Sequence, residues 1–164
     1  MTAPAVLRDG RGHLWLACPD GRYVMKGDSP KFARTVEELR SPGFAAQIGE
    51  VESVSPAGWC KELSELAVAY DSTLTLVRGW YHDPQQGSRE HWWTTRPDGT
   101  IHDPASAQFT TPGVAFLYEE FDGTVECEEC GKDMAEAEAL EMAATFGSSL
   151  PVCSERCFRR MVGL

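Results

Sequence analysis

Short apolar stretches alternate with turn-forming residues at the start of the chain. Residues 5–25 hold several such stretches, separated by an Asp-Gly-Arg-Gly turn at residues 9–12 and by a Pro-Asp-Gly turn, and this alternation is typical of a β-hairpin. A short helix is expected to begin after Thr35, which can serve as its N-cap, and to end at the Ser-Pro-Gly sequence of residues 41–43. The pattern therefore predicts a small N-terminal β-rich appendage over residues 1–45.

The middle of the chain changes to helical spacing and then back to strands. Apolar side chains recur at helical intervals within residues 60–70, which predicts a helix there. Strands are expected after it at residues 73–81, 91–95, 100–103 and 113–118, with a polar loop at residues 82–90. A helix followed by antiparallel strands predicts an α+β core over residues 46–122, in which the helix packs on a small antiparallel sheet.

Two further helices are expected in residues 123–164. Asp133 can cap a helix that runs from residue 134 to about residue 146, where Gly147 ends it. Ser154 can cap a last, shorter helix. The chain is therefore expected to have three parts, namely the appendage, the α+β core and this C-terminal module.

The composition is that of a folded chain. Of the 164 residues, 42% are hydrophobic and 10% aromatic, which is enough for a packed core and excludes wholesale disorder. No apolar run approaches the roughly 18 residues that a membrane helix needs. The first residues also lack the basic and apolar regions of a signal peptide. We therefore expect a soluble, cytoplasmic protein without a membrane partner.

The net charge of −10 is concentrated toward the C-terminus. Residues 113–164 hold 4 basic and 11 acidic side chains, and an acidic surface repels the phosphate backbone of nucleic acids. The only basic cluster in this part consists of Arg156, Arg159 and Arg160. The charge therefore disfavours nucleic acid as a partner and favours a protein or peptide. The oligomeric state stays open.

Four of the six cysteines have the spacing of a zinc site: Cys127, Cys130, Cys153 and Cys157. Two close pairs, separated by 22 residues, can supply the four thiolates of a tetrahedral Zn²⁺ site, one pair from a hairpin and the other from the start of a helix. Gly131 allows the backbone to turn tightly beside the metal. Four thiolates leave no open coordination position, so the zinc would be structural. The alternative is two reduced thiol pairs or two disulfides.

This C-terminal module resembles treble-clef zinc knuckles. Their second half often reads Cys-Ser-x-x-Cys followed by Arg, as residues 153–157 and the arginines after them do here. Treble clefs often bind nucleic acid or protein. With the acidic charge of this module, the resemblance implies a contact with protein or a purely stabilising role.

Cys60 lies outside the zinc set and has the surroundings of a reactive thiol. It stands at the start of the predicted helix, where the helix dipole lowers the pKa of a thiol. His91 begins a strand 31 residues later, and Asp103 ends the partner strand after 12 more. A nucleophilic thiol needs a base, and the base needs an acceptor that orients it. The order of these residues is therefore that of a Cys-His-Asp triad.

This order resembles the papain-like and transglutaminase-like superfamily of cysteine hydrolases. The matching pieces are Gly-Trp-Cys at residues 58–60, Val-Arg-Gly at 77–79, His-Trp-Trp at 91–93 and Asp-Gly-Thr-Ile-His-Asp-Pro at 98–104. The last two are similar to a His-x-Trp and Asp-Gly-x-x-x-Asp-Pro pattern of bacterial and phage members. The resemblance covers residues 55–120 and implies a papain-like core with Cys60 as nucleophile, His91 as general base and Asp103 as the orienting acid.

The activity implied by the resemblance is a thiol hydrolase or acyl transferase acting on amide bonds. Peptidase, deamidase and transglutaminase-type reactions all fit a thioester on Cys60. Gln47 lies upstream of Cys60, where papain-like enzymes place a glutamine, although it is farther away than usual. The alternative is a non-catalytic protein-interaction module that keeps a papain-like scaffold and contacts its partner through the zinc tail.

The length of the loop after the His91 strand decides which residue can face His91. With a three-residue loop at residues 97–99, Trp93 lies opposite Asp103, and Asp103 shares the face of His91. With a loop of two or four residues, His102 takes that face instead. The hairpin sequence leaves both registers open, and the resemblance favours Asp103.

Overall fold

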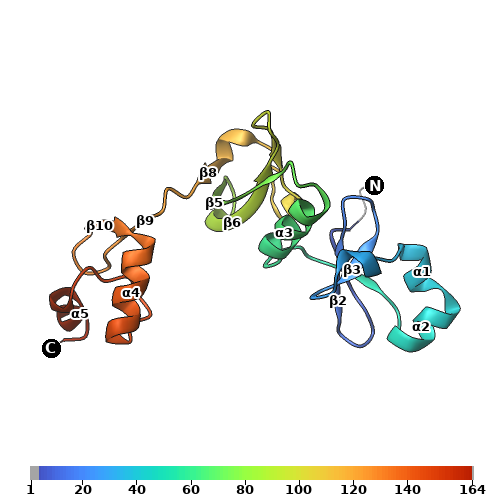
Figure 1. The fold of residues 1–164 in the computed structure, drawn as a ribbon, viewed down its shortest axis with the longest axis horizontal. Helices are drawn as coiled ribbons and strands as arrows, with labels where there is room; N and C mark the ends of the chain where they lie inside the picture. The colour runs from blue at the N-terminus through green and yellow to red at the C-terminus, as the bar shows by residue number, and fades with distance from the viewer. Residues whose placement is uncertain (1–3, 164) are drawn as a thin grey trace. The chain divides into compact units, whose positions relative to one another are not determined.

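A computed structural model describes residues 4–163, which form two compact units with the boundary between Glu120 and Phe121. The fold is mixed α and β, and the strands described pair antiparallel throughout (Figure 1). These features confirm the α+β class in its coarse form. Within residues 4–163, no helix has the length and apolar character needed to cross a bilayer.

The first unit begins with a four-stranded sheet in the order β3-β2-β1-β4. Its strands are β1 (Val6–Arg8), β2 (Leu14–Ala17), β3 (Tyr23–Met25) and β4 (Glu52–Val54). Two short helices, α1 (Val36–Arg40) and α2 (Pro42–Ile48), separate β3 from β4. Thr35 caps α1 as predicted, because its side chain accepts the Glu38 N–H while the Glu38 carboxylate accepts the Thr35 N–H.

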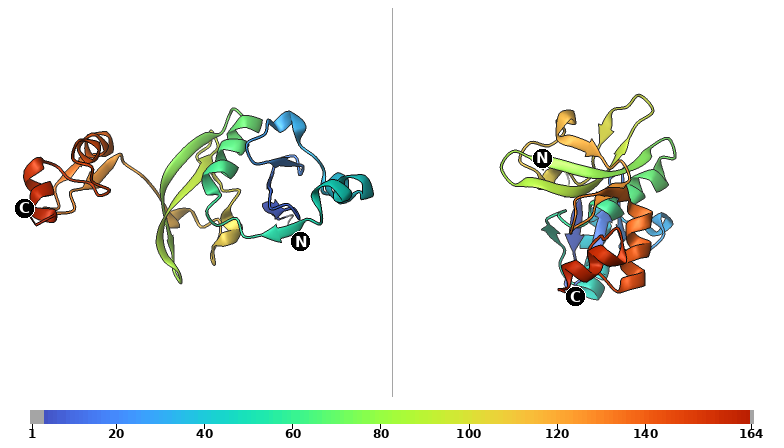
Figure 2. Two further views of the ribbon diagram at one scale, coloured as in Figure 1. Left: turned by 90° about the horizontal axis from the view of Figure 1, so that it is seen from below. Right: turned by 90° about the vertical axis from the view of Figure 1, so that its left-hand side faces the viewer.

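A helix and a second sheet complete the first unit. The helix α3 (Cys60–Tyr70) packs on the sheet β7-β6-β5-β8, as the two further views show (Figure 2). The strands are β5 (Thr75–Asp83), β6 (Gly87–Thr95), β7 (Ile101–His102) and β8 (Tyr118–Glu120). On its other side, Leu63 of α3 joins Val6 and Leu16 of the first sheet in one buried cluster. The helix that begins with Cys60 is therefore fixed between two sheets.

The prediction of a polar loop at residues 82–90 is wrong. In the structure β5 continues to Asp83 and β6 begins at Gly87, so the two strands form one long hairpin. The buried Asp83 carboxylate closes it by accepting the backbone N–H groups of Gln85 and Gln86 and the hydroxyl of Thr110. Most of the polar residues in this stretch therefore belong to paired strands. The turn between these strands is held by the Asp83 side chain.

Two other boundaries differ from the expectation. The strand expected at residues 113–118 is a 3₁₀ turn, Ala115–Leu117, followed by the short strand β8. The helix expected from residue 134 begins at Glu136, because Asp133–Ala135 forms a strand instead of a cap. Both changes add a strand pairing, and both pairings depend on partners elsewhere in the chain.

Gly79 is needed where β5 lies between β6 and β8. A Cβ atom there would collide with the carbonyl oxygen of Glu119 and lie 2.6 Å from the ring of Trp93. Gly79→Ala is therefore expected to destabilise the first unit by about 1–3 kcal/mol, since neither the strand backbone nor the buried ring can yield cheaply. Urea unfolding followed by tryptophan fluorescence measures this change.

Gly43 supplies the matched control for that substitution. It lies in α2 with open space where its Cβ would be, so Gly43→Ala is expected to leave stability unchanged or slightly raised. An equal effect of the two substitutions would contradict the close packing assigned to Gly79.

The second unit is small, and two of the four side chains in its buried cluster are cysteines. Its elements are β9 (Thr124–Glu126), β10 (Asp133–Ala135), α4 (Glu136–Phe146) and α5 (Glu155–Met161). Met134 and Ala139 pack with Cys127 and Cys157. As predicted, Gly147 ends α4 in the left-handed conformation, and Ser154 caps α5 by accepting the Cys157 N–H.

Candidate functional site

Three elements of the first unit bring together the residues proposed as a triad. Cys60 is the first residue of α3, His91 lies in the middle of β6, and Asp103 directly follows β7. His91 Nε2 is hydrogen-bonded to Asp103, and the Cys60 thiol lies near enough to His91 for each group to shift the pKa of the other. The structure therefore brings the three side chains into one neighbourhood.

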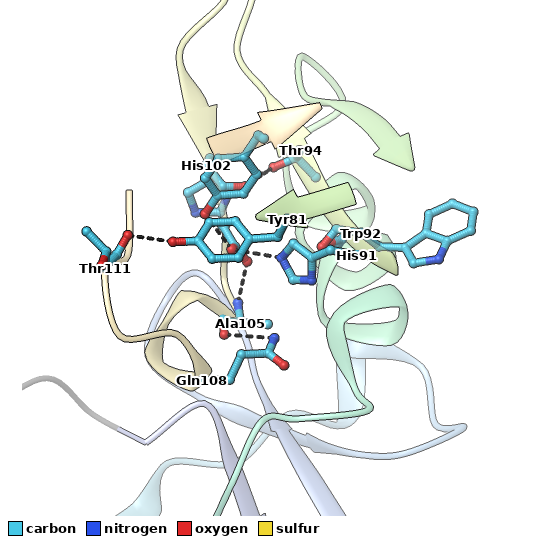
Figure 3. Close-up of polar contacts among 11 residues, drawn as sticks. Tyr81, His91, Trp92, Thr94, His102, Ala105, Gln108 and Thr111 are labelled. Carbon is cyan, nitrogen blue, oxygen red and sulfur yellow. Dashed lines mark hydrogen bonds and ion pairs between the residues drawn. The ribbon is translucent and has the colours of Figure 1, made fainter. Parts of the chain in front are cut away.

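The hairpin between β6 and β7 has the three-residue loop. Thr94 pairs with His102 and Thr95 with Ile101, so the next position places Asp103 opposite Trp93. His102 lies on the other face, where its ring contacts the Thr94 hydroxyl at 3.0 Å (Figure 3). Of the two registers left open by the sequence, the structure therefore has the one in which Asp103 faces His91.

The His91–Asp103 pair is short and buried. His91 Nε2 lies 2.8 Å from Asp103 Oδ2, and the two side chains are only 1% and 2% exposed. The backbone N–H of Ala105 donates to Asp103 Oδ1 at 2.9 Å, and the Tyr118 hydroxyl donates to Oδ2 at 2.8 Å. Three donors thus fix the carboxylate, and the carboxylate fixes the imidazole.

Aromatic rings enclose His91. Phe109 meets the imidazole edge-on at 4.7 Å between centroids, and Trp93 lies nearly parallel to it at 6.1 Å. Tyr81 stands next to His91 and directs its hydroxyl away from it, to the Thr111 carbonyl (Figure 3). These rings exclude water from the His91–Asp103 pair, which strengthens its electrostatic interaction.

The Cys60 thiol is half-buried at the N-terminus of α3. Burial alone would raise its pKa, but hydrogen bonds from His91 and from the backbone N–H of Trp92 outweigh burial and lower the pKa below its usual value. Because His91 Nε2 is held by Asp103, Nδ1 is the ring nitrogen that remains for the thiol. A thiol with a depressed pKa beside an imidazole is the arrangement of an activated nucleophile.

His91 has the complementary shift. Its burial disfavours the charged form, but the hydrogen bonds to Asp103 and Cys60 outweigh burial and raise the pKa of His91 to about 9. The two directions together shift the pair toward a Cys60 thiolate beside a His91 imidazolium. Such an ion pair holds a nucleophile and a proton donor at the same place.

Ser64 docks the helix that carries Cys60. It lies one turn after Cys60, is fully buried, and donates its hydroxyl to the Trp92 carbonyl at 3.1 Å. Trp92 therefore holds α3 through its carbonyl, which accepts from Ser64, and its backbone N–H contributes to the lowered pKa of Cys60. Sequence reasoning missed Ser64, although a polar side chain four residues after Cys60 on the apolar face was a usable signal.

Ser64→Ala is expected to lower the free energy of unfolding by about 1–2 kcal/mol, because the partly buried Trp92 carbonyl then loses its donor. Ser41→Ala is the matched control. Its hydroxyl also donates to a carbonyl, that of Glu38, but at an exposed position where water can replace it. Urea unfolding of both variants checks the difference, and equal losses would contradict the docking role.

The four cysteines predicted as metal ligands lie together in the second unit. Their Sγ atoms all lie within 4.8 Å of one another, and all are free thiols. Cys153 Sγ is 3.7 Å from Cys130 Sγ and 3.5 Å from Cys157 Sγ. Four sulfurs about 2.3 Å from a central Zn²⁺ are about 3.8 Å apart in a tetrahedron, so the cluster fits a single metal ion.

The backbone around the four cysteines favours the binding of a metal ion. Gly131 has a positive φ of 67°, as the tight turn requires, and its N–H donates to the Cys127 carbonyl. Burial disfavours ionisation of Cys127, but backbone N–H groups of Cys153, Cys130 and Glu129 outweigh burial and lower the Cys127 pKa to about 6. A thiol that ionises this readily is a good metal ligand.

Gln47, the upstream glutamine, is exposed on α2.

Comparisons of this chain with protein-family models, with curated proteins and with solved structures find no match. The assignment of a function therefore depends on the two clusters of side chains described above.

Proposed function

We propose that this protein is a thiol-dependent hydrolase or acyl transferase that acts on amide bonds of peptides or proteins. The observation that carries the proposal is the buried 2.8 Å contact between His91 Nε2 and Asp103 Oδ2, with the Cys60 thiol near enough to the same imidazole to shift its pKa. The residue order of a papain-like or transglutaminase-like core, of the type in bacteria and phages, supports the same function.

The proposed reaction starts from the Cys60 thiolate and the His91 imidazolium. The Cys60 thiolate attacks the amide carbonyl carbon, and a tetrahedral intermediate forms. The C–N bond breaks, the His91 imidazolium gives its proton to the leaving amine, and a thioester remains on Cys60. Neutral His91 then takes a proton from water or from an acceptor amine, which attacks the thioester. The C–S bond breaks, and the Cys60 thiolate is released beside the re-formed His91 imidazolium.

In this proposal the cysteine cluster of the second unit binds zinc as a structural ion. Four sulfur ligands favour Zn²⁺ over harder cations and leave no position for a substrate. The free state of all six cysteines supports work in a reducing compartment such as the cytoplasm. The acidic charge of the zinc-knuckle module favours a protein partner there over nucleic acid.

A peptide library offered together with a primary amine in ¹⁸O-labelled water tests the proposal. Mass spectrometry distinguishes ¹⁸O at new chain ends, conversion of a carboxamide to a carboxylate, and incorporation of the amine. We expect one of these products with the wild-type protein and none with Cys60→Ala. Removal of the base in His91→Ala should lower the rate at least about 100-fold.

Cys18→Ala provides the matched control, since Cys18 is a buried thiol beside Tyr70 and away from His91. It should form the same product as wild type. Products that persist in Cys60→Ala would contradict the proposal, and peptides that are retained but not altered would favour the non-catalytic interaction module.

A further inference from the structure

One oxygen of Asp103 accepts two hydrogen bonds. Oδ2 lies 2.8 Å from His91 Nε2 and 2.8 Å from the Tyr118 hydroxyl, while Oδ1 accepts the N–H of Ala105. A triad needs only the first of these contacts. The second comes from β8, which sequence reasoning did not connect with the site.

The position of the Tyr118 hydroxyl is set by packing. Its ring meets Trp93 edge-on at 5.2 Å and Tyr81 edge-on at 4.8 Å between centroids. The strand that carries it pairs with β5 through Tyr81 opposite Tyr118 and Gly79 opposite Glu120. Burial, together with the charge of Asp103, raises the pKa of Tyr118, so the phenol remains a donor across the working pH range.

The hydroxyl directs the positive end of its dipole at the oxygen that attracts the His91 proton. A donor on that oxygen spreads the carboxylate charge over two hydrogen bonds, which weakens the pull on the imidazolium. An imidazole with too high a proton affinity gives its proton to a leaving amine slowly, because a general acid works best near the operating pH.

We propose that Tyr118 is a positioning residue that acts through Asp103 and lowers the proton affinity of His91, so that the imidazolium can release its proton during the reaction. This inference rests on the proposed function. Ala105 and His91 still hold the carboxylate when the phenol is removed, so its loss should make His91 more basic without displacing Asp103.

The titratable groups that face His91 come from four elements. Cys60 belongs to α3, Asp103 follows β7, Tyr118 belongs to β8 and Tyr81 to β5. Tyr81 gives a matched control, because it is also a tyrosine beside His91, although more buried than Tyr118, and its hydroxyl donates to Thr111 at 2.6 Å and not to Asp103. Phenylalanine at either position keeps the ring and removes one hydroxyl.

The experiment is an NMR titration of the His91 ring in the full, metal-loaded chain. We expect Tyr118→Phe to raise the titration midpoint of His91 by about one pH unit, and Tyr81→Phe to leave it at the wild-type value. A merely structural role for Tyr118 would not move this midpoint upward. An unchanged or lowered midpoint in Tyr118→Phe, or an equal rise in Tyr81→Phe, would overturn the inference.

Alkylation of Cys60 by iodoacetamide distinguishes a failure of the role proposed for Tyr118 from a failure of the proposed function. In Tyr118→Phe the thiolate should react near neutral pH at least as fast as in wild type, because a more basic His91 stabilises it further. If Cys60 is slow in wild type, the proposed function fails, whatever the titration shows. If Cys60 is fast and the His91 midpoint does not rise in Tyr118→Phe, only the role of Tyr118 fails.

Discussion

Removal of the metal is expected to unfold residues 121–164 while the first unit stays folded. The buried cluster of the second unit consists of Cys127 and Cys157 with Met134 and Ala139, so two of its four side chains belong to the group of four cysteines that could hold a metal ion. A unit of this size buries too little apolar surface to be stable alone. The proposed structural zinc would contribute on the order of 10 kcal/mol, which chelation would remove.

Two probes separate the units in this experiment. All five tryptophans precede residue 120, so tryptophan fluorescence reports only the first unit. Hydrogen exchange read by mass spectrometry reports the second. With a zinc chelator, we expect fast exchange over residues 121–164 and unchanged fluorescence.

Two serine substitutions give the genetic form of the same test. Cys130→Ser should abolish the binding of about one equivalent of metal and reproduce the effect of the chelator. Cys18→Ser, outside the cluster, should retain the metal. A metal-free protein whose residues 121–164 remain protected would show that the cluster does not stabilise this unit.

Asp103→Ala is expected to destabilise the first unit by about 3–5 kcal/mol, because it leaves a buried imidazole without its partner. The variant also leaves the Tyr118 hydroxyl and the Ala105 N–H without an acceptor. Urea unfolding followed by tryptophan fluorescence measures the loss. Asp103→Asn keeps one acceptor oxygen and the side-chain volume, and we expect it to lose less.

The loss in Asp103→Ala should depend on pH. The folded pKa of His91 is raised from 6.5 to about 9, so its protonation stabilises the folded state fully below the unfolded pKa and no longer above the folded one. The difference between wild type and Asp103→Ala should therefore be largest below about pH 6.5 and shrink as the pH rises through about 9. A difference independent of pH would contradict a charged His91–Asp103 pair.

Local signals predict the parts of this protein that depend on short stretches of chain. The helix from Cys60, the cap at Thr35 and the short spacing within each cysteine pair all rely on residues close together in the sequence. The loop after β6 is also held by local contacts, since the Asp98 carboxylate accepts the Thr100 N–H and Gly99 adopts a positive φ of 81°, but the sequence left its length open. That loop places Asp103, not His102, beside His91.

Other features depend on contacts that no local pattern contains. Asp83 closes its hairpin with help from Thr110, which is 27 residues away. Tyr118 reaches Asp103 only because β8 returns to the edge of β5, and Gly79 makes room for that return. A single sequence shows that these residues exist but not which of them meet.

The pH dependence of Cys60 alkylation tests the central claim most directly. Iodoacetamide reacts with the thiolate, and peptide mapping by mass spectrometry locates the product at Cys60 in wild type and in His91→Ala. Near neutral pH we expect wild type to react at least about tenfold faster than His91→Ala, and we expect the two rates to converge at about pH 10, where the thiol ionises without help. Equal, slow labelling of Cys60 in both proteins near neutral pH would contradict an activated nucleophile at this site.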